Sequence, residues 1–325
     1  MAAFGILLLI LDARTAIDSA RDGVSICLRA VIPSLFPFLV LSCILTSSLW
    51  GTKSKILRPI GKLCGVPEGA ESLLLLGFLG GYPVGAQSVS DAYHRGYLSK
   101  SAAERLLGFC NNAGPSFIFG ILGVAFSSKS ASWALWLIHI GSAVIVGMLL
   151  PGKNKENCVM QSKPMLSLPK ALERSLGVMA TICGWVVAFR VILGVLDRWI
   201  FWILPAEIRV LLTGILELSN GCLALCEVTS EGTRFVLSSL MLALGGLCVG
   251  MQTVSVTGKL GTGMYFYGKA MQSLLSFLLA MICQHLLFPN SECLNIPSFA
   301  YAAVLAVSGI LYYWIARKKV VAICA

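Results

Sequence analysis

Polar and helix-breaking residues interrupt several long apolar runs of this sequence. The stretch LLGFLGGYPVGAQ at 75–87 contains the break Gly80-Gly81-Tyr82-Pro83. Irregular backbone at membrane depth persists only where protein buries it or where it lines a water-filled cavity. A break also frees backbone N–H groups at the start of the next helix, where the helix dipole favours an anion. We therefore predict that this break binds a ligand, with close packing of the tip against other helices as the alternative.

Three further breaks carry polar side chains of the kind that bind small solutes. They lie in LLGFCNNAGPSFIFG at 106–120, in VLLTGILELSNGCLA at 210–224 and in LALGGLCVGMQTVSVTG at 242–258. Amide, hydroxyl and carboxyl groups at membrane depth are costly unless they are bonded, and an acidic group there indicates function. The predicted substrate-binding residues are Gly80, Gly81, Tyr82, Pro83, Asn111, Asn112, Ser116, Glu217, Ser219, Asn220, Gln252 and Ser255.

Several of these residues have a second interpretation. Asn111 and Asn112 either contact substrate or satisfy the broken backbone of the facing hairpin. Glu217 either carries a coupled proton or a cation, or forms a buried ion pair with Arg190. In a third arrangement Arg190 faces an anionic substrate while Glu217 titrates. These alternatives predict different partners for each side chain.

The composition indicates an all-α polytopic integral membrane protein. Of the 325 residues, 57% are hydrophobic and 12% are charged, whereas soluble domains carry about 25% charged residues. Residues 1–11 are too short to span and are predicted to continue as a first helix through 12–20. Apolar segments of about 20 residues, long enough for a ~30 Å hydrocarbon core, are predicted at 24–49, 106–126, 133–150, 176–196, 235–257, 264–288 and 297–316.

The distribution of basic residues predicts which loops face the cytoplasm. Clusters of Lys and Arg lie at 53–62, 95–105, 153–170 and 317–319. If the positive-inside rule holds for all four, segment 73–86 enters and leaves the membrane from the same side. The pattern thus predicts about eight transmembrane helices plus two re-entrant hairpins, with the N-terminal side and the C-terminus cytoplasmic. A plain ten-helix arrangement would place some basic loops outside.

The two halves of the chain contain the same order of breaks. Hairpin segment 73–86 corresponds to 210–224, and interrupted segment 106–120 corresponds to 242–258. Because an odd number of crossings separates the halves, they are predicted to form an inverted repeat, as in secondary transporters. The predicted organisation is a first transmembrane repeat at 1–151, a cytoplasmic linker at 152–170 and a second, inverted repeat at 171–325.

The same motifs resemble those of the YlbJ-like sporulation integral membrane proteins, within the group that has the nucleoside-recognition "gate" domain. The resemblance is carried by GYPVGA at 81–86, by SDAYHRGYLSKSAAERLLGFCNNAGPSFIFG at 90–120, and by ILELSNGC and GGLCVGMQTVS in the second half. It implies a role in endospore formation and movement of dipicolinic acid from the mother cell toward the forespore. The implied location is the cell membrane of a sporulating cell, with the outer forespore membrane as one candidate.

We therefore expect a transporter or facilitator of a small organic anion, with dipicolinic acid as the first candidate. A nucleoside or related small solute is the alternative, and a structural sporulation membrane protein without transport is the alternative of another class. No enzyme and no cofactor are expected, because the sequence has no GxSxG or HExxH motif. The net charge of +10 is attributed to topology and anionic lipid headgroups, not to nucleic acid. The expected partners are the substrate, membrane lipids, and a second copy of the chain or other sporulation membrane proteins.

Overall fold

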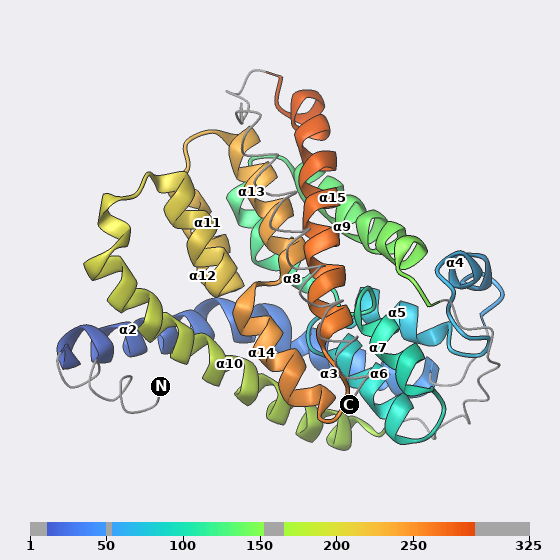
Figure 1. Cartoon of the computed structure of the whole chain (residues 1–325). Helices are drawn as coiled ribbons and strands as arrows, with labels where there is room; N and C mark the ends of the chain where they lie inside the picture. The colour runs from blue at the N-terminus through green and yellow to red at the C-terminus, as the bar shows by residue number, and fades with distance from the viewer. Residues whose placement is uncertain (1–11, 50–53, 153–165, 290–325) are drawn as a thin grey trace, which may run out of the picture.

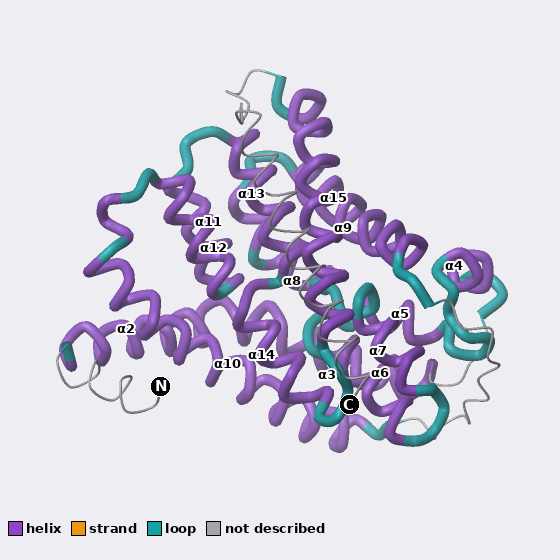
Figure 2. The backbone as a smooth tube through the Cα atoms, viewed as in Figure 1, coloured by secondary structure: helices purple, strands orange, loops and turns teal. Residues whose placement is uncertain are grey.

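The chain folds into helices of very different lengths. A computed structural model describes residues 12–49, 54–152 and 166–289, and every element in these ranges is a helix (Figure 1) (Figure 2). The α-helices are α2 (Ala13–Ile26), α3 (Ile32–Leu49), α4 (Arg58–Leu63), α5 (Ser72–Leu79), α6 (Val84–His94), α7 (Lys100–Leu107), α8 (Pro115–Gly120), α9 (Lys129–Leu149), α10 (Leu168–Trp199), α11 (Ala206–Leu216), α12 (Leu218–Ala224), α13 (Glu231–Leu244), α14 (Gly246–Thr257) and α15 (Gly263–Leu287). The shorter elements are the π turn η1 (Cys27–Val31) and the 3-10 turns η2 (Leu122–Ala125), η3 (Phe201–Ile203) and η4 (Leu225–Glu227).

The first long element is one helical run. α2, η1 and α3 follow one another without a break, so the expectation of separate helices at 12–20 and 24–49 is wrong. The π turn lies just before Pro33, which has no N–H to donate to the carbonyl group four residues earlier. The hydroxyl of Ser34 donates to the carbonyl oxygen of Ala30 at 2.6 Å and satisfies one acceptor of this region. Residues 1–11 lie outside the described part of the chain.

The two longest helical runs cross each other along one side of the molecule. α10, with 32 residues, packs along α2 and α3 below the shorter helices in the view of Figure 1. Ion pairs join them, with Arg190 3.3 Å from Asp22 and Arg198 3.3 Å from Asp12. The crossing therefore connects the beginning of the first half to the beginning of the second.

Each half then contains two short helices that turn back on each other. α5 and α6 form the first hairpin, and α11 and α12 form the second. A Cβ atom on Gly85 would lie 3.1 Å from the Cα of Gly77, and one on Gly221 would lie 2.2 Å from the Cα of Gly214. In a straight helix, residues seven or eight apart would be separated by about 10–12 Å. Glycine on both arms therefore lets each hairpin close tightly.

An interrupted helix follows each hairpin and packs against it. α7 and α8 are separated by a break that includes Cys110, whereas α13 and α14 meet at the pair Gly245-Gly246. A Cβ on Gly77 would lie 2.0 Å from the carbonyl oxygen of Cys110, and one on Gly246 would lie 2.8 Å from the carbonyl oxygen of Gly214. In both halves, the hairpin thus lies directly against the break of the next helix.

α9 and α15 complete the two halves and lie side by side (Figure 1). α15 packs against α13 as well as α9, and the hydroxyls of Ser142 and Ser276 meet at 2.7 Å across the α9–α15 contact. The order of elements is therefore the same in both halves, with a long helix, a hairpin, an interrupted helix and a second long helix.

Five helical runs of the described residues are long and apolar enough to cross a membrane. They are Ala13–Leu45, Lys129–Leu149, Leu168–Trp199, Glu231–Thr257 and Gly263–Leu287. The all-helical membrane fold is confirmed, but the described residues do not supply the predicted eight spans. Segment 106–126 divides into α7, α8 and η2, because the NNAGP sequence breaks it. Segment 297–316 and most of the linker, 153–165, lie outside the described residues.

Candidate functional site

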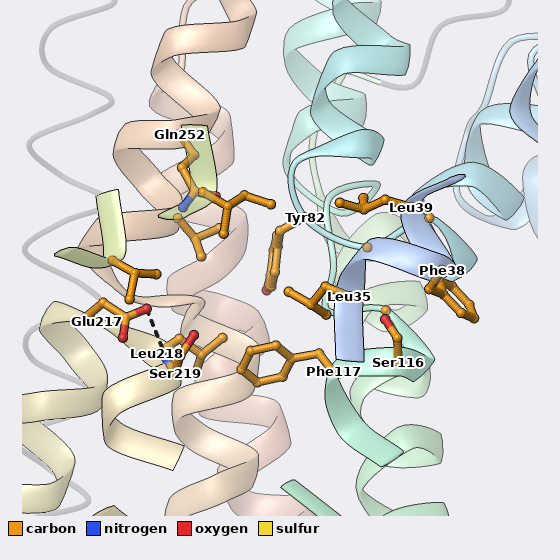
Figure 3. Close-up of a pocket in the computed structure, with 16 residues that line it drawn as sticks. Leu35, Phe38, Leu39, Tyr82, Ser116, Phe117, Glu217, Leu218, Ser219 and Gln252 are labelled. Atoms are coloured by element: carbon orange, nitrogen blue, oxygen red, sulfur yellow. Dashed lines mark hydrogen bonds between the residues drawn. The ribbon is translucent and has the colours of Figure 1, made fainter. Parts of the chain in front are cut away.

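Both hairpin tips and both interrupted helices meet at one small cavity (Figure 3). α3 and α10 contribute apolar side chains to its wall, including Leu35 and Val186. Tyr82 projects between the side formed by Glu217 and Ser219 and the side formed by α3 (Figure 3). The predicted binding residues that line the cavity are Gly80, Gly81, Tyr82, Ser116, Glu217, Ser219 and Gln252.

The cavity is closed to organic solutes in this conformation because it is small. Its volume is about 50 Å³, and a water molecule needs roughly 10–15 Å³, so the space holds a few waters. Pockets for small organic ligands are typically about 300–1,000 Å³. An organic solute therefore requires the surrounding tips and helices to move apart.

At the first tip, protein acceptors already occupy donors at the beginning of α6. The N–H of Gly85 donates to the carbonyl oxygen of Gly81 at 3.3 Å, and the N–H of Ala86 donates to Asn111 Oδ1 at 3.2 Å. These two donors are not free for an anion in this conformation. Pro83 directly precedes α6 and lies outside the cavity lining. Gly80, Gly81 and Tyr82 are the residues of this tip that face the cavity.

Glu217 caps the second tip. Its carboxylate is 2% exposed and accepts bonds from the N–H groups of Ser219 at 3.0 Å and Asn220 at 2.6 Å. The side-chain amide of Asn220 donates a third bond at 2.6 Å. The first N–H groups of a helix have no partner within the helix, so the carboxylate stabilises the start of α12 while one side of Glu217 faces the cavity.

Arg190 does not pair with Glu217, which contradicts the ion pair that was one of the alternatives for these two residues. Its guanidinium instead contacts Asp22 at 3.3 Å and Asp197 at 3.2 Å. Both partners belong to the crossing of α2 and α10, where the three side chains are partly exposed. The described structure therefore gives Glu217 polar donors as partners and no cationic side chain.

Arg190 and its aspartates line a second, open cavity of about 500 Å³ between α2, α10, α11 and α12. We call this cavity the vestibule; its further lining residues include Arg209, which pairs with Glu227. Asn220 also lines the vestibule, and it bonds Glu217 of the closed cavity. The contact between Asn220 and Glu217 therefore lies between the two cavities.

The side chain of Asn111 bonds a backbone group of the first hairpin, which is one of the two roles considered for it. The side chain is fully buried, accepts from Ala86 at the start of α6, and donates from Nδ2 to Thr253 Oγ1 at 2.9 Å. It does not line the cavity. Its amide thus joins the first hairpin to α14, and both hydrogen-bonding groups are occupied.

Asn112 has a different partner, which the sequence analysis missed. Its Oδ1 accepts from Lys269 Nζ at 3.1 Å and from Gln272 Nε2 at 3.0 Å, and its Nδ2 donates to the carbonyl oxygen of Phe109 at 2.7 Å. Lys269 is 1% exposed. The available signal was a lysine inside the apolar segment 264–288, because charged groups at membrane depth are rare and commonly functional.

On α14, Gln252 faces the cavity and Ser255 does not. Gln252 is 4% exposed, with Nε2 3.5 Å from Cys248 Sγ. Ser255 is exposed, and its hydroxyl donates to the carbonyl oxygen of Met251 at 2.8 Å. Three residues along a helix rotate a side chain by about 60°, which here moves Ser255 out of the buried face. Ser255 is therefore not a lining residue, contrary to the prediction.

Comparison with known proteins identifies one similar relative. The chain is 28% identical over 169 residues to the sporulation integral membrane protein YlbJ of Bacillus subtilis (strain 168). The matched segment covers 49% of this chain and 41% of the relative, so it spans less than half of each. No family model and no solved structure matches the chain. The similarity confirms the resemblance to YlbJ-like sporulation integral membrane proteins that the motifs indicated.

Proposed function

We propose that this integral membrane protein transports a small organic anion during endospore formation, with dipicolinic acid as the first candidate. One observation carries the transport proposal: both hairpin tips and both interrupted helices line a single cavity surrounded by apolar helices. Broken helices at membrane depth are typical of transporter binding sites. The alternative of a purely structural protein does not require four breaks to converge on a cavity.

The sporulation part of the proposal rests on the relative. Its printed name describes a sporulation integral membrane protein, and the motif resemblance adds dipicolinic acid as the expected solute. The cell membrane of a sporulating cell, or the outer forespore membrane, is the proposed location. A second copy of the chain or other sporulation membrane proteins remain proposed partners.

We further propose that α5–α6 and α11–α12 are re-entrant hairpins of an inverted repeat, with the C-terminus cytoplasmic. The basic clusters that the positive-inside rule uses and the equal order of elements in the two halves support this topology. In this arrangement the repeats comprise 1–151 and 171–325, joined by a cytoplasmic linker at 152–170. Thiols introduced at Glu71 and Ser99 then become labelled from the same side of the membrane, and labelling from opposite sides contradicts the hairpin topology.

The vestibule provides a route to the closed cavity. Asn220 lines the vestibule and bonds Glu217 on the cavity side, so movement of the second tip would connect the two spaces. Arg190 and Arg209 bring positive charge to the vestibule, although carboxylates pair with both. We propose that an anion enters here and that the tips separate to admit it.

A nucleoside is the second candidate because of the polar groups in the closed cavity. Its described lining contains the carboxylate of Glu217, the amide of Gln252 and the hydroxyl of Ser219, and contains no Lys, Arg or His. Such groups match the hydroxyls and base edges of a neutral solute. A dianion could bind beside Glu217 only if this carboxylate is protonated, or if the three donors that bond it fully compensate its negative charge.

Flux into proteoliposomes tests the proposal. Purified protein is reconstituted, and uptake of radiolabelled dipicolinate is compared with uptake of radiolabelled uridine and with protein-free vesicles. Dipicolinate uptake above background supports the first candidate, and uridine uptake alone selects the second. Background uptake of both solutes by correctly folded protein contradicts transport of either class.

A further inference from the structure

A buried lysine lies directly behind the cavity wall. The ammonium of Lys269 on α15 is 2.8 Å from Gln272 Oε1, 3.1 Å from Asn112 Oδ1 and 3.4 Å from the hydroxyl of Tyr82. It also lies 5.2 Å from the centroid of the Tyr82 ring, within the range of a cation–π contact. The three donors of an ammonium group thus meet three oxygen atoms from three segments of the chain.

Lys269 has no counter-ion among the described residues. The titratable groups nearest to it are Tyr82 at the first tip, Cys110 in the break after α7, and His139 on α9. Tyr265, one turn earlier on α15, lies close to Tyr82. An ammonium buried without a carboxylate is far more costly than a neutral amine. The proton on Lys269 is therefore held by neutral oxygen atoms alone.

Charged groups on the other helices that pack against α15 are engaged elsewhere. On α7, Glu104 accepts from the N–H of Gly261, and Arg105 donates to the carbonyl oxygen of Gly147 at 2.6 Å. On α13, Glu231 accepts from Ser127 and Arg234 donates to the carbonyl oxygen of Ala125 at 2.8 Å. None of these groups neutralises Lys269.

Tyr82 connects Lys269 to the second half of the chain. Its hydroxyl donates to the carbonyl oxygen of Leu242 at 3.1 Å. Leu242 lies in the last turn of α13, where carbonyl groups lack helical donors. The same tyrosine lines the closed cavity. A continuous set of polar contacts therefore runs from Lys269 through the first tip to the break between α13 and α14.

We propose that Lys269 is the positioning residue that keeps the cavity closed, and that loss of its proton accompanies opening. This inference rests on the proposed transport function and names the proton as its coupled ion. The ammonium of Lys269 and the carbonyl oxygen of Leu242 together hold the hydroxyl of Tyr82 in place. The tip stays in place while all three ammonium donors are occupied.

The proton step needs only water as the acceptor. One N–H bond of the ammonium breaks, its electron pair stays on nitrogen, and the proton leaves as hydronium through water that enters the cavity. The neutral amine keeps two donors, which match Asn112 Oδ1 and Gln272 Oε1, and gains a lone pair. That lone pair competes for the hydroxyl proton of Tyr82, so the bond from Tyr82 to Leu242 is released.

Thiol labelling of the cavity tests this inference without any substrate. Ser116 lines the cavity, and Ser116→Cys is treated with a membrane-impermeant cationic methanethiosulfonate in detergent. Mass spectrometry of the peptide that contains this position separates its adduct from the native cysteines. The labelling rate is divided by that of the same protein carrying Lys269→Arg, because this ratio cancels the pH dependence of the thiol. We expect the ratio to rise with pH by up to about tenfold per unit, because the fraction of Lys269 that has lost its proton rises in this way.

Further variants separate the lysine charge from general damage to the fold. Lys269→Met is expected to label rapidly at every pH, whereas the exposed Lys259→Met behaves like the parent protein. Tyr82→Phe, which keeps the ring and removes the contact to Leu242, also labels rapidly and without the pH-dependent ratio. It remains informative if Lys269→Met fails to fold. The inference is overturned if the labelling ratio of the parent does not change with pH. It is also overturned if folded Tyr82→Phe still shows a pH-dependent labelling ratio. Background solute flux alongside a pH-dependent ratio instead overturns the proposed substrates and leaves the lysine role intact.

Discussion

Replacing Glu217 by alanine tests whether this carboxylate holds the second tip together. In the structure it accepts two backbone N–H groups, from Ser219 and Asn220, and one side-chain N–H from Asn220. Each buried donor left without an acceptor costs about 1–3 kcal/mol. Because the two backbone donors begin α12 and have no helical partner, Glu217→Ala is expected to lower the free energy of unfolding by roughly 2–6 kcal/mol.

Glu217→Gln is a milder substitution at the same position and should cost less stability than Glu217→Ala. Glutamine keeps one acceptor oxygen but places an amide donor beside Asn220, so the loss of about one bond predicts a cost of roughly 1–3 kcal/mol. The exposed Glu207→Ala on α11 is the control and should change stability by less than about 0.5 kcal/mol. Thermal and denaturant unfolding of the three variants in detergent is expected to show the largest loss of stability for Glu217→Ala, a smaller loss for Glu217→Gln and almost none for Glu207→Ala.

Equal stability of Glu217→Ala and the parent would refute the capping role. The double variant with Arg190→Met adds a second check, because an ion pair between the two residues would make the arginine substitution restore stability. Arg190 contacts Asp22 and Asp197 instead, so we expect no rescue. A rescue of more than about 1 kcal/mol, above the usual coupling error, would contradict the contacts described here.

Three further predictions concern the glycine contacts and the buried amide. Gly81→Leu is expected to reduce solute flux to background, since Gly81 has a φ of +73° and lines the cavity; Gly141→Leu, on an open helix face, should keep parental flux. Gly77→Ala should destabilise by about 1–3 kcal/mol or more, measured by thermal unfolding, because its Cβ would lie 2.0 Å from the carbonyl oxygen of Cys110; parental stability would contradict this packing. Asn111→Ala leaves the buried N–H of Ala86 without an acceptor and removes the donor to Thr253 Oγ1, so it should cost about 1–3 kcal/mol in the same assay; an unchanged melting temperature would argue against its bonds to both partners.

The breaks of this fold were predictable because glycine and proline act locally. Gly80-Gly81-Tyr82-Pro83 interrupts the first hairpin, and Gly245-Gly246 interrupts the second broken helix. Positive φ angles at Gly81, Gly245 and Gly246 explain why these residue types appear there. Glu217 was predictable for a related reason, since a lone carboxyl group within an apolar segment needs either function or dedicated donors.

The partners of the polar residues depended on tertiary packing and were not predictable from spacing. Asn111 and Asn112 are adjacent in sequence, yet one bonds the first hairpin and the other bonds Lys269 on α15. An ion pair with Glu217 was one of the arrangements considered for Arg190, whereas α2 supplies its partner Asp22 from a distant part of the sequence. The contacts of Asn112 with Lys269 and of Arg190 with Asp22 join residues more than 150 positions apart, where no local pattern carries information.

The glycine contacts inside each hairpin also have a mechanical consequence. Gly77 packs against Gly85, and Gly214 against Gly221, with no space between the two arms of each hairpin. We therefore expect each hairpin to move as one rigid unit about its base, with the tip displaced farther than the base. A small tilt imposed where the arms meet the surrounding loops is thereby amplified at the tip.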